Sequence, residues 1–583
     1  MSTRVLAVAV AATVLAGAAA LILSTREDDP GPDGIPPGAP SLEEMATAVG
    51  APVLRHLARG SVEGRSGDLI VVPRPHNYLI GQPDYETLDT ATPWINTSHP
   101  NPWSYLTRVP IIVWGRGVPE GSERHEVVDI AQIAPTFARL LDFDFEADAP
   151  PLPGVFSAGS PHPKMVVTVV IDGGGWNVLT AHPRSWPTLR RLRIQGTTYV
   201  NATIGSAPAI TGALHATLGT GSYPSAHGIP GNVMRSPEDG SIVDVFLDNA
   251  DPRFLERATL SEAWDEAHKN KAVVGTVSWE GWHLGMIGRG AQRSGGDRDL
   301  AVVWDVDENE WWINEEFYRL PRYLQATDVA RLERHEEAMD DRDGLRDGLW
   351  FGHTLDDLRD PKLRSATSAF ARFTGDAVID VVRNEPWGRD AITDFLWVEL
   401  KAPDTAGHQF NMVNPEVGDV VAETDAQIGR LIDELDRKVG RESYVLVVTA
   451  DHGQQPLAEA TGGWRISMQE LEIDLVAAFG DIVEKVTTAD LYLDRNAMER
   501  LNVREEDVAR FLGAYTLGDS IPKGVAGSNR VPRARLDERI IAGAFPGEWL
   551  RNLSGSELDG FGSGKFPQSR LTLAPTSEAQ NGE

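Results

Sequence analysis

The segment Met165–Gly175 (MVVTVVIDGGG) decides the fold, because seven mostly β-branched residues run directly into an aspartate and three glycines. A continuous run of this kind is typical of a strand that is buried on both faces of a parallel sheet. Two later segments have the same form, DFLWVEL over 394–400 and YVLVVTADHG over 444–453. Helix-like segments separate these runs. The alternation predicts an α/β fold with a doubly wound, mostly parallel sheet.

Three further runs extend the predicted sheet. They are GDLIVVPRP (67–75), VPIIVWGRG (109–117) and KAVVGTVSW (271–279). In doubly wound sheets, ligands bind at the carboxyl ends of the strands. The residues that directly follow each strand are therefore the first candidates for a functional site.

Aspartate and histidine follow three of the predicted strands. The first run ends in Asp172, the second leads to Asp404 and His408, and the third leads to Asp451 and His452. Each residue alone is more often a turn residue, a helix cap or a satisfied polar group. Carboxylate oxygens and imidazoles gathered at converging strand ends suit zinc or manganese, and they suit two ions better than one.

Thr211 is the candidate nucleophile. It precedes a short helix of small residues that ends at Gly219–Gly221, and helix N-termini favour anions. A bound metal would lower the pKa of its hydroxyl. The alternative is that Thr211 only caps the helix, which is a common role for threonine.

This region resembles a known family. The pattern Thr211…His215…Thr220-Gly-x-Tyr-Pro-x-x-His227-Gly-Ile…Asn232 is similar to the nucleophile region of the alkaline phosphatase superfamily, and most similar to its type I phosphodiesterase/nucleotide pyrophosphatase branch. The resemblance implies an alkaline-phosphatase-like fold and two Zn²⁺ ions, with Mn²⁺ or another divalent ion as alternatives. It implies one ion on Asp404, His408 and a further histidine, and another on Asp172, Asp451, His452 and the Thr211 oxygen.

The further histidine is missing from its usual place. In the family it follows the Asp-His-Gly motif, but no histidine follows His452 in this chain. A similar segment lies near the N-terminus instead, around His99. We therefore predict a circular permutation, in which residues 45–150 are the family's C-terminal segment. His99 would complete the first metal site, within about 7 Å of Asp404 and His408, because Zn–N bonds are about 2 Å long. Otherwise His99 is an ordinary loop histidine.

The resemblance also implies the mechanism. Thr211 would attack phosphorus and form a phosphothreonine, and Asn232 would donate to a phosphoryl oxygen. Monoesterases of this branch often carry a Lys-x-Arg pair that contacts the phosphate. Arg289 matches its arginine, although Ile287 stands at the lysine position and Arg289 could equally be a surface residue.

Composition narrows the choice of substrate. The 583-residue chain has 54 basic and 85 acidic residues, so its net charge of −31 disfavours nucleic acids and anionic membranes as partners of the body. A small phosphorylated substrate remains possible because buried metals dominate their local field. The absence of cysteine excludes disulfides, thiolate ligands, cysteine nucleophiles and sulfatases that need a modified cysteine.

The predicted organisation starts with an apolar run. Residues 5–24 are uncharged and long enough to span a bilayer, so we expect a single-pass anchor or a cleaved signal, with the body outside the cytoplasm. The other predicted parts are a Pro/Gly-rich linker (27–44), the permuted segment (45–150), a second linker (151–163), the main catalytic domain (164–560) with a cap insertion at about 280–365, and a disordered tail (561–583).

Three functions are open at this stage. The first is a metal-dependent phosphoester hydrolase outside the cytoplasm, acting as a phosphodiesterase, nucleotide pyrophosphatase or phosphatase. The second is an enzyme that transfers or hydrolyses phosphate groups of the cell envelope. The third is a binding protein that kept the fold and lost the chemistry. The sequence leaves the substrate, the metal and the oligomeric state open.

Overall fold

A computed structural model describes residues 34–81, 96–157, 159–246, 250–522 and 531–566. The run 5–24, predicted as an anchor or signal, lies outside these residues. Among the helices of the described ranges, none combines the length and the apolar character needed to cross a bilayer.

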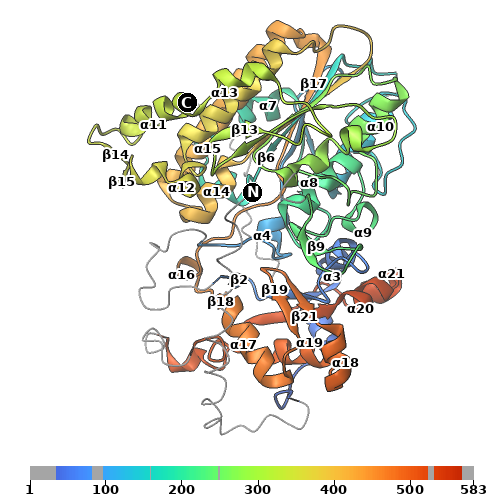
Figure 1. The fold of residues 1–583 in the computed structure, drawn as a ribbon, viewed down its shortest axis with the longest axis vertical. Coiled ribbons are helices and arrows are strands. Elements are labelled where there is room, and N and C mark those ends of the chain that lie inside the picture. Colours follow the sequence, from blue (N-terminus) through green and yellow to red (C-terminus); the bar gives the residue numbers. More distant parts are fainter. Residues whose placement is uncertain (1–33, 82–95, 158, 247–249, 523–530, 567–583) are drawn as a thin grey trace, which may run out of the picture.

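A nine-stranded, mostly parallel sheet forms the upper part of the molecule in Figure 1. Its five central neighbours, from β12 to β17, all run parallel to one another. The predicted α/β architecture is therefore confirmed. In sheet order the strands are β13 (Glu310–Trp312), β12 (Leu300–Asp305), β11 (Val274–Val277), β16 (Asp394–Leu400), β6 (Met165–Ile171), β17 (Tyr444–Thr449), β3 (Ile111–Gly115), β7 (Thr197–Tyr199) and β4 (Ser122–Arg124).

Helices cover both faces of this sheet. Successive side chains of β6 point to opposite faces and pack under different helices. Val167 and Val169 belong to the core under α13 (Ser368–Asn384) and α15 (Pro415–Lys438). Val166 and Val170, which point to the opposite face, belong to the core under three other helices. These are α5 (Ile133–Leu140), α8 (Thr211–Thr220) and α10 (Leu260–Ala267). Burial on both faces explains the unbroken apolar run of β6.

Two of the predicted strands differ from the expected parallel arrangement. The run 109–117 forms β3, which lies antiparallel to β17. The run 67–75 forms β1 (Leu69–Pro73), which lies in a separate antiparallel sheet of order β19–β20–β1–β21. All five residues of β1 are buried, and a fully buried run does not reveal the direction of its neighbours. The other strands of this sheet are β19 (Val483–Val486), β20 (Asp490–Leu493) and β21 (Ile541–Pro546).

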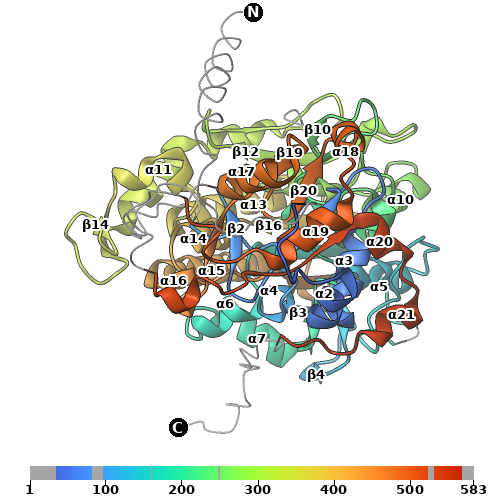
Figure 2. The same ribbon diagram turned by 90° about the horizontal axis from the view of Figure 1, so that it is seen from below.

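The two ends of the described chain pack together around this second sheet. Helices α2 (Leu42–Val49) and α3 (Ala51–Gly60) lie beside α19 (Glu505–Ala514), α20 (Gly547–Asn552) and α21 (Gly555–Gly560) (Figure 2). The linker was predicted to run to residue 44, but α2 already begins at Leu42, with Ser41 as its N-cap. The first residues of the predicted disordered tail are ordered, since Lys565 donates to the Ala48 carbonyl, and residues 567–583 lie outside the described chain.

The predicted cap insertion is partly core. Within 280–365, β12 pairs in parallel with β11, and its Trp304 is buried. The short helix η2 (Gly281–Met286) packs against α8. The elements that lie away from the sheet in Figure 1 are α11 (Val329–Glu337), β14 (Leu349–Trp350) and β15 (His353–Thr354).

Candidate active site

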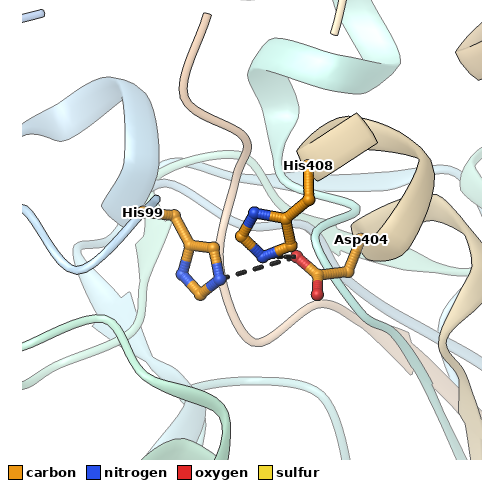
Figure 3. A group of neighbouring side chains, drawn as sticks. All are labelled: His99, Asp404 and His408. Atoms are coloured by element: carbon orange, nitrogen blue, oxygen red, sulfur yellow. Dashed lines mark ion pairs between the residues drawn. The ribbon is translucent and has the colours of Figure 1, made fainter. Parts of the chain in front are cut away.

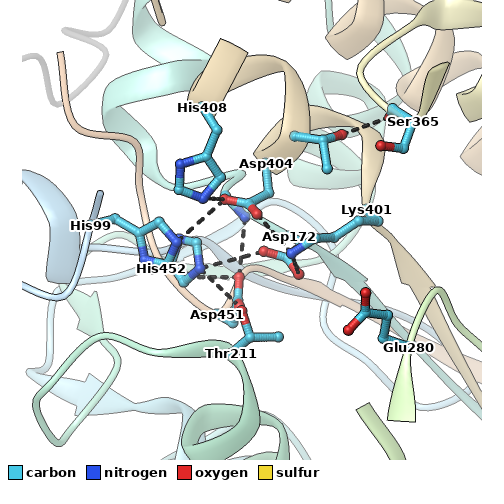
Figure 4. A network of polar contacts seen from close by, with 12 residues as sticks. His99, Asp172, Thr211, Glu280, Ser365, Lys401, Asp404, His408, Asp451 and His452 are labelled. Atoms are coloured by element: carbon cyan, nitrogen blue, oxygen red, sulfur yellow. Dashed lines mark hydrogen bonds and ion pairs between the residues drawn. The ribbon is translucent and has the colours of Figure 1, made fainter. Parts of the chain in front are cut away.

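The carboxyl ends of β6, β16 and β17 bring the predicted residues together. Asp172 directly follows β6, Asp404 lies in α14 (Ala402–Gln409) after β16, and Asp451 follows β17. Because the three strands are parallel neighbours, their ends meet at one edge of the sheet (Figure 4).

The first cluster consists of His99, Asp404 and His408 (Figure 3). Nε2 of His99 lies 3.6 Å and Nε2 of His408 lies 3.4 Å from Oδ1 of Asp404. The predicted proximity of His99 is therefore confirmed. Each imidazole donates from Nδ1 to a backbone carbonyl, His99 to Ala209 at 2.8 Å and His408 to Thr97 at 2.6 Å. These bonds leave both Nε2 atoms directed at the carboxylate, as in histidines that bind metals.

The second cluster consists of Asp172, Asp451 and His452, all fully buried. Nε2 of His452 lies 3.4 Å from Oδ1 of Asp172 and 3.2 Å from Oδ2 of Asp451. The other oxygen of Asp451 accepts hydrogen bonds from the backbone amides of Gly173 and His452. Backbone donors thus fix this carboxylate while Oδ2 faces the cluster.

Both clusters fit a divalent cation. Asp172 Oδ1, Asp451 Oδ2 and His452 Nε2 have no hydrogen-bond partner among the described residues. Burial opposes the ionisation of Asp172, but the ammonium of Lys401 holds its pKa well below the usual range. Burial and the charge of Asp172 raise the pKa of Asp451 well above its usual value. A bound cation would favour both carboxylates in the ionised form.

Thr211 and Asn232 lie together at the start of α8. Thr211 is the first residue of the helix, and Ile210 occupies the N-cap position, so Thr211 is not the capping residue. The side-chain oxygen of Asn232 accepts a hydrogen bond of 2.9 Å from the Gly212 amide. Thr211, Asn232 and the whole first cluster line one cavity of about 650 Å³.

Arg289 does not line this cavity, so the structure does not bring it together with the other predicted site residues. Its Nη2 lies 2.9 Å from Oε1 of Glu262, and its Nε donates to the same oxygen. Glu262 is buried, and a buried carboxylate needs a cationic or hydrogen-bonding partner. Arg289 is also absent from the residues that line the cavity.

Lys401 is a site residue that the sequence prediction missed. Its buried ammonium lies 2.9 Å from Oδ2 of Asp172 and 2.7 Å from Oδ2 of Asp404 (Figure 4). It therefore contacts one carboxylate of each cluster, and it lines the same cavity. Its position is the sequence feature that could have indicated this role. Lys401 directly follows β16 and precedes Asp404 by three residues, which places both on one side of a helical turn.

Several known proteins are similar to this chain. The family model described as type I phosphodiesterase / nucleotide pyrophosphatase matches residues 166–519. Alkaline phosphatase PafA of Elizabethkingia meningoseptica is 26% identical over 407 residues, which cover 60% of this chain and 73% of PafA. Alkaline phosphatase PhoV of Synechococcus elongatus is 25% identical over 341 residues, which cover 52% of this chain and 61% of PhoV.

Among solved structures, the crystal structure of wild-type PafA aligns with a TM-score of 0.49 and 20% identity, covering 66% of this chain and 84% of PafA. The family match spans more than half of the chain. The protein therefore belongs to the type I phosphodiesterase/nucleotide pyrophosphatase family and is a phosphoester hydrolase.

Proposed function

We propose that the protein is a metal-dependent phosphoester hydrolase that uses Thr211 as its nucleophile on small phosphorylated substrates outside the cytoplasm. One observation carries the proposal: Thr211 lines the same cavity as the cluster of His99, Asp404 and His408. The apolar run 5–24 supports the extracytoplasmic location.

Two divalent ions would complete the site. His99, Asp404 and His408 would hold one, and Asp172, Asp451 and His452 would hold the other beside the Thr211 oxygen. Imidazole and carboxylate donors favour Zn²⁺, with Mn²⁺ as the alternative. When bound, the ions would lower the pKa of the Thr211 hydroxyl and neutralise charge on the phosphoryl oxygens.

The protein's own groups would orient the phosphate. Backbone amides at the N-terminus of α8 favour an anion next to Thr211. Asn232, held by the Gly212 amide, lies at the same end of the helix and would donate to a phosphoryl oxygen. Lys401 would supply the cationic contact for which the sequence had suggested Arg289.

The reaction would proceed in two displacements. Oγ1 of Thr211 forms a bond to phosphorus while the ester oxygen leaves, giving a phosphothreonine. Water then attacks this phosphorus, the P–Oγ1 bond breaks, and the threonine hydroxyl is restored. Trp279, Trp282 and Val486 on the cavity wall would receive an apolar or aromatic leaving group.

The test is a comparison of Thr211→Ala with Thr211→Ser in the full chain loaded with Zn²⁺. An aryl phosphate, a bis-aryl phosphate and a nucleotide serve as substrates. We expect Thr211→Ala to lose at least about 10³-fold in kcat, because the nucleophile is removed. Thr211→Ser should keep part of the activity, because serine retains the hydroxyl. Unchanged turnover by Thr211→Ala would exclude Thr211 as the nucleophile.

A further inference from the structure

Three aspartates gather at the opposite edge of the main sheet from the candidate active site. They are Asp265, near the end of α10, and Asp297 and Asp299, which precede β12. β12 and β6 run in the same direction within the sheet. The residues before β12 therefore lie at the amino ends of the strands, whereas Asp172 follows the carboxyl end of β6. Since the six residues of β12 span about 20 Å, the group is separate from both clusters of the active site.

The carboxyl groups of the three aspartates converge. One side-chain oxygen of each lies within 4.8 Å of those of the other two. Asp265 and Asp299 are buried, with exposed fractions of 4% and 9%, whereas Asp297 is exposed. The group therefore has two carboxyl groups that the interior holds in place and one side that is open to water.

The carboxyl group of Asp265 lacks a partner inside the protein. Its Oδ1 is buried and accepts no hydrogen bond from the described residues. The backbone of the same residue is satisfied, because its carbonyl accepts from the amides of His268 and Asn270. A buried carboxylate oxygen that has lost its water and gained no hydrogen bond is costly. The side chain that faces Asp297 and Asp299 therefore calls for a ligand from outside the chain.

No cationic side chain offsets the charges of this group. Across the ranges that the structure covers, none of the three aspartates forms an ion pair with a lysine, arginine or histidine. Arg293, which precedes β12, pairs with Glu262 and Glu266 instead. Arg319, beside the start of β12, pairs with Glu385. The positive charge that this group lacks has to come from protons or from a bound cation.

Repulsion within the group affects its pKa values. Burial, and then the charge of Asp297, raise the pKa of Asp265 to about 7. Burial and the same neighbour raise the pKa of Asp299 well above its usual value. A divalent cation between the oxygens would reverse both shifts, since it favours the ionised form of every ligand.

We propose that Asp265, Asp297 and Asp299 bind a calcium ion, which joins the end of α10 to the start of β12. A ligand set made only of oxygen suits Ca²⁺, whereas imidazole suits Zn²⁺ and its neighbours. Ca²⁺ also accepts a variable number of ligands in flexible geometry, so water on the open side can complete its coordination, whereas Mg²⁺ demands a near-ideal octahedron. Because the ion lies at the far edge of the sheet from the reaction, its role is structural.

The test measures the effect of calcium on the full chain. The protein is stripped of metal, loaded with Zn²⁺ so that the clusters of the active site are filled, and then unfolded by heat at rising concentrations of CaCl₂. We expect the melting temperature to rise with calcium over roughly 10⁻⁴–10⁻³ M, the range of extracellular calcium modules, and NaCl of equal ionic strength not to reproduce the rise. Crystals grown with calcium should show one ion within about 2.6 Å of an oxygen from each aspartate. No ion at this place in millimolar calcium would overturn the proposal.

Variants separate this site from calcium bound elsewhere on the acidic surface. Asp265→Asn removes the buried ligand and Asp297→Asn removes the exposed one, and each should abolish the calcium-dependent rise in melting temperature. The exposed Asp297 can be changed without disturbing the core. Asp425→Asn is the matched control: Asp425 is also buried, but its oxygens accept the amides of Thr188 and Leu189, and this variant should keep the full response. An equal rise in the wild type and both site variants, or no rise in the wild type, would contradict the site.

Discussion

At the scale of the residue, Lys401 sets the charge balance of the site. Its ammonium contacts Asp172 and Asp404, and it contributes to a pKa below the usual range for both carboxyl groups. Burial acts in the opposite direction on both. The lysine therefore keeps ligands of both clusters ionised as the pH falls, and it also offers a cation to the phosphate.

Lys401→Met should weaken catalysis most strongly at low pH. Without the ammonium, the pKa values of Asp172 and Asp404 rise, so protons compete with metal at higher pH. We expect the acidic limb of log kcat/KM to move to higher pH, and kcat/KM at its maximum to fall by about 10-fold or more, which corresponds to the loss of a charge-assisted hydrogen bond. Lys401→Arg, which keeps the charge, is the control. An acidic limb that coincides with that of the wild type would contradict this role.

Individual residues of the site also differ in whether they could be predicted from sequence. Asp172, Asp404 and Asp451 could be found because they follow apolar strands whose ends must meet. Lys401 was missed, because a lysine after a strand usually faces solvent, and its burial depends on two carboxylates that follow different strands. Arg289 was assigned from a local match, but its partner Glu262 lies in another element, and sequence spacing does not reveal that pairing.

At the scale of the element, close packing against η2 positions α8, the helix that begins with Thr211. Every residue of α8 is buried, and the helix carries small residues where η2 crosses it. A Cβ on Gly219 would lie 2.6 Å from the Met286 carbonyl oxygen, and a Cβ on Gly285 would lie 2.8 Å from the Ala216 Cα. These glycines let the two backbones approach, which brings His283 against His215.

Gly219→Ala should therefore destabilise the protein, although alanine is the better helix former. Helix propensity alone would favour alanine by about 1 kcal/mol. The clash involves backbone atoms that cannot move aside, and we expect a net loss of about 1–3 kcal/mol, typical of overpacking. Thermal unfolding measures whether Gly219→Ala lowers or raises the melting temperature. Gly555→Ala is the control, because a Cβ there meets nothing within 4 Å. A melting temperature at or above that of the wild type would disprove the packing argument.

At this scale, the sequence did not reveal whether a buried strand has parallel or antiparallel neighbours. The segments 165–171, 274–277, 394–400 and 444–449 form adjacent parallel strands, as their apolar runs indicated. β1 and β3 have similar apolar runs but antiparallel neighbours. Burial on both faces gives the same sequence signature in both arrangements, so only the tertiary partners decide the direction.

At the scale of the whole molecule, the N-terminal segment completes both the second sheet and the first cluster. β1 lies between β20 and β21, and His99 lies beside Asp404. The family match, by contrast, begins at residue 166, after this segment. The circular permutation, in which residues 45–150 correspond to the end of other family members, stays a prediction.

Restoring the expected family order should preserve the fold. The rearranged chain would start at residue 159, run to residue 566, and continue through a flexible linker into residues 41–157. The ends to be joined lie close together, because Lys565 donates to the Ala48 carbonyl and Ala51 donates to the Gly562 carbonyl. A Gly/Ser linker of about ten residues spans roughly 17 Å on average, which suffices to reach the start of α2.

We expect the rearranged chain to fold and to hydrolyse the same phosphoesters with kcat/KM within about 10-fold of the wild type, because chains whose termini adjoin tolerate such reordering. Circular dichroism and the aryl phosphate assay measure the two properties. The rearranged chain that also carries Thr211→Ala should be inactive, which ties any turnover to the same site. An unfolded product would contradict a simple permutation of the family fold.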